Sequence, residues 1–114
     1  MEVVLDQPER QNLLGLFMKA ALESRADRIA DVRPSGDIAL TAGPMSVTLS
    51  FEPERVTVRK GVADRPRAHL KGSLAALIQI ARGRPLRQLL TRRARISGNP
   101  LALLPLSRVF RKEG

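Results

Sequence analysis

The first periodic segment of the chain has hydrophobic residues at helical spacing. The residues that would share one helix face are Leu13, Leu14, Phe17, Ala20 and Ala21. Asp6 is a candidate N-cap, Pro8 is tolerated in a first turn, and Glu9 can complete a capping box with Asp6. The pattern predicts an N-terminal helix within residues 1–24.

Between residues 28 and 71 the hydrophobic positions alternate with polar ones, which is the period of a half-buried strand. The clearest run is residues 45–52, where Met45, Val47, Leu49 and Phe51 occupy every second position. Shorter runs of the same kind are separated by segments rich in proline and glycine, which favour turns. Because such short connections favour antiparallel neighbours, we expect a mostly antiparallel sheet with one apolar face.

Helical spacing returns in residues 73–93, which predict two helices, the first capped by Ser73. Residues 94–98 predict a short strand closed by Gly98. Residues 99–112 predict a terminal helix that is apolar nearly all round, with Pro105 kinking it or delaying its start. The element order favours a single α+β domain spanning residues 1–114, with helices covering one face of the sheet.

Charge is distributed unevenly along the 114 residues. Residues 1–52 carry a net charge of −3, whereas residues 53–114 hold fifteen basic and three acidic side chains, a net charge of +12. This asymmetry favours an anionic partner such as a lipid surface or nucleic acid, although a solvated arginine-rich face explains it equally well. With no Trp, no Tyr and three Phe, the chain has no base-stacking platform, so nucleic acid could be bound only by non-specific phosphate contacts.

Residues suited to catalysis are few. The absence of cysteine excludes a disulfide framework, a thiol nucleophile and a thiolate zinc site. His69 is the single histidine and is expected to face solvent on the polar side of a strand. The serines and glycines match no nucleophile elbow or phosphate-binding loop. We therefore expect a protein that is not an enzyme and has no cofactor or metal; the lack of a signal sequence or spanning segment favours the cytoplasm.

The C-terminal half resembles the sterol carrier protein 2 family. The stretches that carry the resemblance are Arg55–Gly61, Ala68–Ile78, Ala81–Pro85 and Arg95–Asn99, within residues 36–110. The resemblance implies a curved five-stranded sheet that encloses an apolar tunnel for sterols, fatty acyl chains or isoprenoid lipids, without catalysis by the domain alone. Some relatives look like accessory factors in bacterial ubiquinone biosynthesis. Asn99 stands where the family commonly has Asp, which keeps a capping oxygen and loses its charge.

Our hypothesis is a lipid-binding module whose last segment acts as a lid over an apolar cavity. The predicted lining residues are Phe17, Val47, Leu49, Phe51, Val56, Val58, Leu77, Ile78, Ala81, Leu89, Leu90, Leu101, Leu104, Leu106 and Phe110. The residues predicted to meet an anionic membrane surface are Arg82, Arg84, Arg87, Arg92 and Arg93. The same aliphatic residues could instead form only a packed core.

Two alternatives remain open at this point. The apolar C-terminal helix could dock on a partner, such as a lipid-modifying enzyme, or on a second copy of the chain. The basic half could instead bind nucleic acid non-specifically, with an affinity that falls steeply as salt rises.

Overall fold

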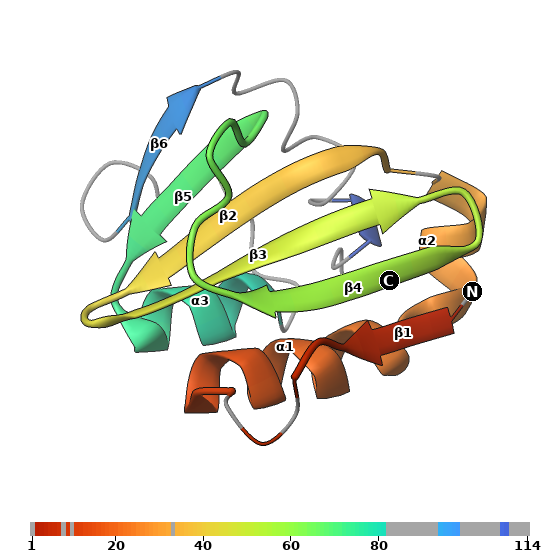
Figure 1. The fold of residues 1–114 in the computed structure, drawn as a ribbon, viewed down its shortest axis with the longest axis horizontal. Coiled ribbons are helices and arrows are strands. Elements are labelled where there is room, and N and C mark those ends of the chain that lie inside the picture. Colours follow the sequence, from red (N-terminus) through yellow and green to blue (C-terminus); the bar gives the residue numbers. More distant parts are fainter. Residues whose placement is uncertain are drawn as a thin grey trace.

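The computed structural model describes residues 2–7, 9, 11–32, 34–81, 94–98 and 108–109. Along this part of the chain a strand is followed by two helices, four strands, a helix and a last strand, which is an α+β arrangement (Figure 1). The strands are β1 (Glu2–Leu5), β2 (Gly36–Ala42), β3 (Met45–Glu52), β4 (Arg55–Lys60), β5 (Ala68–Gly72) and β6 (Ala94–Gly98). The helices are α1 (Leu13–Glu23), α2 (Ala26–Val32) and α3 (Leu74–Ala81).

The described strands form one six-stranded sheet in the order β1-β4-β3-β2-β5-β6. The short turns produce the expected antiparallel meander of β2, β3 and β4, and β6 pairs antiparallel with β5. In contrast, β1 pairs with β4 and β5 pairs with β2 in parallel. The predicted α+β fold with a mostly antiparallel sheet is confirmed, since three of the five pairings between described strands are antiparallel. The predicted strand number of five was wrong, and the two parallel pairings were not predicted. The connection after β4 is long enough to cross the sheet, so the rule for tight turns does not apply to it.

Helix α1 begins later than predicted because the chain before it belongs to the sheet. The backbone N–H of Asp6 donates to the carbonyl oxygen of Val58 at 2.9 Å, which extends the pairing of β1 with β4. The cap is Asn12, whose Oδ1 accepts from the N–H of Gly15 at 2.8 Å. Asp6 was therefore the wrong choice of cap, and the four-residue strand β1 was missed.

The buried face of α1 also differs from the predicted one. Leu14, Met18 and Leu22 are buried at i, i+4 spacing, whereas Leu13 remains 62% exposed. Ala20 is exposed as well, and Phe17 is partly buried against the core. The helix face that covers the sheet is therefore the one with a large hydrophobic side chain at every fourth position.

Helix α2 occupies residues that the alternation assigned to strands. It covers Ala26–Val32, and Asp27 in its first turn interacts favourably with the helix dipole. Ile29 is fully buried, while Arg28 is partly exposed and Ala30 and Asp31 are exposed. This burial pattern is that of a helix with one buried residue per turn. Residues 28–32 were therefore wrongly predicted as strand.

The later elements follow the prediction where the structure describes them. Ser73 caps α3, since its Oγ accepts from the N–H of Ala76 at 3.1 Å. Strand β6 ends at Gly98, where φ is +84° and an added Cβ would lie 2.8 Å from the carbonyl oxygen of Arg67. Residues 82–93 and most of the predicted helix at 99–112 lie outside the described residues; Arg108 and Val109 within it are helical.

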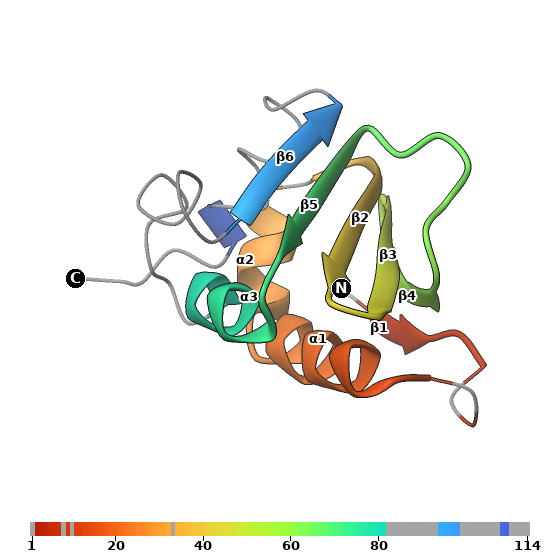
Figure 2. The same cartoon turned by 90° about the vertical axis from the view of Figure 1, so that its left-hand side faces the viewer.

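The two faces of the sheet have different covers. Helices α1 and α3 lie against the inner face, around which the sheet curves (Figure 2). The connection between β4 and β5 lies across the outer face, where Thr48 is only 1% exposed. Its Oγ1 donates to the carbonyl oxygen of Gly61 at 2.8 Å and accepts from the N–H of Ala63 at 2.9 Å. One threonine therefore fastens this connection to the middle of the sheet.

Candidate functional site

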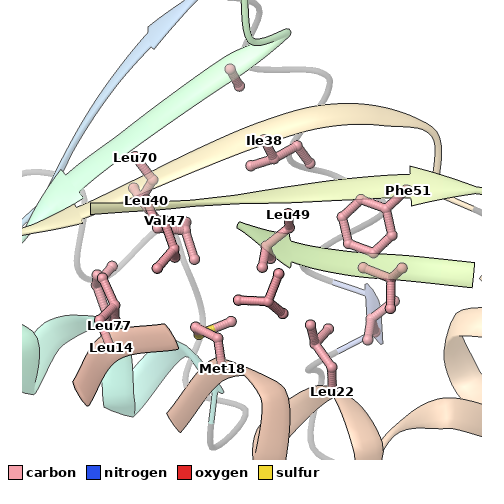
Figure 3. Close-up of a cluster of buried hydrophobic side chains, with 14 of the residues drawn as sticks. Leu14, Met18, Leu22, Ile38, Leu40, Val47, Leu49, Phe51, Leu70 and Leu77 are labelled. Atoms are coloured by element: carbon pink, nitrogen blue, oxygen red, sulfur yellow. The ribbon is translucent and has the colours of Figure 1, made fainter. Parts of the chain in front are cut away.

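The inner face of the sheet is a continuous apolar surface. All five strand residues predicted to line a cavity point to this face and are at most 5% exposed. They are Val47, Leu49, Phe51, Val56 and Val58. Neighbouring strands add Ile38, Leu40 and Leu70 to the same buried cluster (Figure 3). The strand alternation thus correctly identified which side chains gather under the helices.

Helix residues close this surface from the other side. Leu14, Met18 and Leu22 of α1 point toward the sheet, and Leu77 of α3 joins them beside Leu14 (Figure 3). None of the three α1 residues was in the predicted lining: Leu14 was placed on the apolar helix face but not in the lining, and Met18 and Leu22 were not placed on that face. Their spacing of four residues is the signal that could have identified them.

Other predicted lining residues have different positions. Phe17 is partly buried against the core, Ile78 is partly exposed, and Ala81 is the last residue of α3. Val109, which was not predicted, is fully buried in the same cluster. The remaining predicted residues lie outside the described part of the chain: Arg82, Arg84, Arg87, Leu89, Leu90, Arg92, Arg93, Leu101, Leu104, Leu106 and Phe110.

An open pocket of about 800 Å³ is lined by residues of α2, of the segment before β2 and of the turn from β3 to β4. Figure 1 shows α2 beside this turn at one end of the sheet. Phe51 belongs both to this pocket and to the buried cluster. The other described lining residues are Ala30, Pro34, Ser35, Glu52, Pro53 and Glu54. The sequence suggested only turns at Pro34–Gly36 and Glu52–Glu54, so the pocket arises from the unexpected position of α2.

Polar chemistry near the inner face is sparse. No group of three or more potential metal ligands occurs among the described residues. His69 lies on the outer face, where burial and, to a lesser extent, the charge of Lys71 lower its pKa below the ordinary value of 6.5. Within the part of the chain that the structure describes, no helix is long and apolar enough to cross a bilayer. The described residues of the inner face are apolar and therefore suited to apolar contact.

Comparison with known proteins assigns the chain to a family. A family model described as the SCP-2 sterol transfer family matches residues 12–111. The chain belongs to this family. Membership places the chain among domains that bind or transfer lipids, and the match begins just before α1 and extends to residue 111.

Solved structures support the same fold. A ubiquinone synthesis protein named UbiJ-SCP2 superposes with a TM-score of 0.71 at 17% identity, covering 86% of this chain and 93% of that one. Sterol carrier protein 2 from Yarrowia lipolytica, without ligand, gives a TM-score of 0.53 at 16% identity, covering 84% and 80% of the two chains.

A third structure, a conserved hypothetical protein of Thermus thermophilus, gives a TM-score of 0.53 at 20% identity, with 76% of this chain and 71% of that one covered. At these identities the structures establish only that this chain shares their fold. No curated protein matches the chain.

Proposed function

We propose that this domain binds one hydrophobic lipid without catalysing a reaction, and that the lipid reaches the inner face of the sheet through the pocket beside Phe51. The observation that carries the proposal is the double position of Phe51, which lines the open pocket and also belongs to the buried cluster. Movement of this ring would open a path from the pocket toward the apolar interior, and α1 would also have to move outward for a ligand to enter it. Membership of the sterol transfer family supports the same class of ligand.

The pocket has the size that such a ligand needs. Small-molecule sites typically measure roughly 300–1,000 Å³, and the volume of about 800 Å³ falls within this range. Burial of about ten methylene groups contributes about 8 kcal/mol, at ~0.8 kcal/mol each. That free energy corresponds to binding in the micromolar range, even without a polar anchor.

The rim of the pocket favours a ligand whose polar end is uncharged. Glu54 is exposed at the rim, and Glu52 lies beside it within 3.6 Å of the guanidinium of Arg55. A carboxylate headgroup would be repelled by Glu54, whereas a hydroxyl or quinone oxygen would not. Among sterols, fatty acyl chains and isoprenoid or quinone-like lipids, the first and last therefore fit better than an ionised fatty acid.

The other residues that the sequence predicted to line the cavity also have a role in this proposal. The inner-face residues Val47, Leu49, Val56, Val58 and Leu77 would contact the ligand after α1 moves outward. Phe17, Ile78 and Ala81 would flank it. The C-terminal residues of the predicted lid would close over it: Leu89, Leu90, Leu101, Leu104, Leu106 and Phe110.

Delivery or collection of the lipid would occur at an anionic membrane surface in the cytoplasm. The support for this step is the net charge of +12 over residues 53–114, to which Arg82, Arg84, Arg87, Arg92 and Arg93 contribute. Each basic residue near such a surface adds about 1 kcal/mol of attraction. The likeness to a ubiquinone synthesis protein makes a lipid-modifying enzyme a suitable partner, with a homodimer as the alternative.

A pocket-filling substitution tests the proposal. Ala30 is an exposed wall residue on α2, so Ala30→Trp should block the pocket without disturbing the buried core. Ala75→Trp, at an exposed position of α3 away from the pocket, is the matched control. Binding of dehydroergosterol and of cis-parinaric acid is measured by fluorescence, with circular dichroism reporting the fold.

We expect Ala30→Trp to weaken dehydroergosterol binding by about tenfold or more, and Ala75→Trp to leave it within about twofold of the parent. The parent should bind the sterol more tightly than the fatty acid. Ser35→Trp, at another lining residue, provides a second blocked variant if the first fails to fold. Parent-like affinity in both blocked variants, or no binding of either probe by the parent, would overturn the proposal.

A further inference from the structure

The outer face of the sheet carries two cations side by side. Lys71 on β5 lies directly opposite Arg95 on β6 in the strand register, and both side chains are exposed. Leu70 and Ile96, their neighbours along the chain, contact the core, so Lys71 and Arg95 point to the opposite face. Like charges in directly opposed positions repel each other, so this pair has an electrostatic cost that a bound anion would remove.

No described residue neutralises this pair. Neither Lys71 nor Arg95 forms an ion pair or a side-chain hydrogen bond with any residue that the structure describes. Asp37 on β2 has the same strand parity, but it is four residues from Thr41, about 13 Å along the strand. Glu52 is at the far end of the sheet, beside Arg55. The nearest strand positions therefore leave the two positive charges uncompensated.

Hydroxyl groups lie next to the two cations. Thr41 on β2 is the register partner of both Lys71 and Ser46. Its Oγ1 is 2.9 Å from Oγ of Ser46 and 2.6 Å from Nε2 of His69. All three side chains are half-buried, so they form an ordered polar floor beside the exposed cations.

We propose that Lys71, Arg95 and the Thr41–Ser46 hydroxyl pair form a binding site for a phosphomonoester group on the outer face of the sheet. The Arg95 guanidinium and the Lys71 ammonium supply positive charge. The hydroxyl pair can add one O–H donor, because its other hydrogen is used in the hydrogen bond between Thr41 and Ser46. A terminal phosphate has three oxygens to accept these donors, whereas a carboxylate has only two. His69 lies at the edge of the site. Its lowered pKa favours a neutral ring, whose Nε2 forms a hydrogen bond with Oγ1 of Thr41.

The site is separate from the proposed lipid pocket. The pocket opens at the turn between β3 and β4, whereas Thr41 and Ser46 flank the turn between β2 and β3 at the other end of the strands. The bound phosphate could belong to a lipid headgroup or to a soluble phosphate ester. The same side chains would recognise the phosphate group in both cases. The Ala30→Trp variant should bind phosphate like the parent, so the two proposals can fail independently.

The test is an amide chemical-shift titration of the full chain at neutral pH and constant ionic strength. Inorganic phosphate is the probe, and acetate is the comparison anion. We expect saturable shifts at Thr41, Ser46, Lys71 and Arg95 with phosphate and much weaker ones with acetate. The double substitution Lys71→Gln and Arg95→Gln should weaken phosphate binding by at least about tenfold, since two charge-assisted contacts are lost.

The matched control is Arg59→Gln. Arg59 is an exposed cation on β4 that pairs with Thr48 in the register, and two strands, β3 and β2, lie between β4 and β5. The affinity of this variant for phosphate should remain within about twofold of the affinity of the parent protein. Equal shifts with acetate and phosphate, or unchanged affinity in the double variant, would overturn the proposal. The amide spectrum of each variant also reports whether it is folded.

A vesicle-binding experiment identifies which kind of molecule carries the phosphate. Flotation with phosphatidylcholine vesicles containing phosphatidic acid is compared with vesicles of equal surface charge containing phosphatidylserine. Preference for phosphatidic acid that disappears in the double variant supports a lipid headgroup as the ligand. Specific shifts with inorganic phosphate but no such preference support a soluble phosphate ester, and absence of both results refutes the site.

Discussion

The two faces of the sheet are made by the same strands and have opposite chemistry. On β3, Leu49 points inward and is fully buried under α1, while its neighbour Ser50 points outward. On β5, Leu70 is buried in the core, while His69 and Lys71 lie on the outer face. The period of two along each strand is enough to separate an apolar surface from a polar one.

This difference shows how one thin domain can present two kinds of binding surface. The inner face gains free energy by excluding water, so its residues are interchangeable hydrophobic groups of suitable size. The outer face depends on individual polar atoms, such as Oγ1 of Thr41 and of Thr48, whose partners are specific. Substitutions on the inner face should therefore affect stability, and those on the outer face should affect particular contacts.

The largest effect is expected for Leu49→Ala. Leu49 is fully buried in the cluster that contains Met18 and Val58. Removing its side chain should lower the free energy of unfolding by about 2–5 kcal/mol, through lost burial and the cavity left behind. Denaturant unfolding followed by circular dichroism measures this loss.

Ser50→Ala is the control at the next position of the same strand. Its Oγ is buried and has no hydrogen-bond partner in the described part of the chain, so its removal breaks no contact there. We expect a change below about 1 kcal/mol. A loss for Leu49→Ala as small as that for Ser50→Ala would contradict the close packing of the inner face.

An intermediate effect is expected for Thr48→Val, which keeps the size of the side chain. The variant leaves the carbonyl oxygen of Gly61 and the N–H of Ala63 without their partner, and should cost about 1–3 kcal/mol. Faster hydrogen exchange at the Ala63 amide should accompany the loss. Thr57→Val, at a half-buried outer position of β4, should change both quantities much less; equal effects would show that Thr48 does not fasten the connection.

The smallest effect concerns the pH dependence of stability. Burial and Lys71 hold the pKa of folded His69 below its unfolded value of about 6.5. The unfolded chain thus binds more protons between these two values, so this contribution is complete above pH 6.5 and is lost as pH falls through the folded pKa. Unfolding at neutral pH and at about pH 5 should show a slightly smaller pH dependence in His69→Gln than in the parent. An identical dependence in both would contradict the lowered pKa.

Local patterns predicted much of the fold, because several elements depend on local interactions. The alternation in residues 45–52 and the cap at Ser73 correspond to β3 and to the start of α3. Helix α2 and strand β1 were missed because neither contains enough turns or alternations to produce a periodic signal. The parallel pairing of β5 with β2 was missed because it depends on a connection that crosses the sheet.

The candidate sites were less predictable than the fold. Residues such as Val56 and Val58 could be assigned to an apolar face from their alternation alone. The pocket at Phe51 could not, since it requires the position of α2 relative to a distant turn. The juxtaposition of Lys71 and Arg95 likewise depends on the register of two strands separated by 21 residues, from Gly72 to Ala94.

The parallel pairing of β1 with β4 has a consequence for synthesis of the chain. Glu2 is the register partner of Arg55, so this first strand has no neighbour until more than fifty further residues have been translated. During that interval Val3, Val4 and Leu5 remain available to other apolar surfaces, including chaperones at the ribosome. Completion of the sheet edge thus waits for the hairpin of β3 and β4 to leave the exit tunnel.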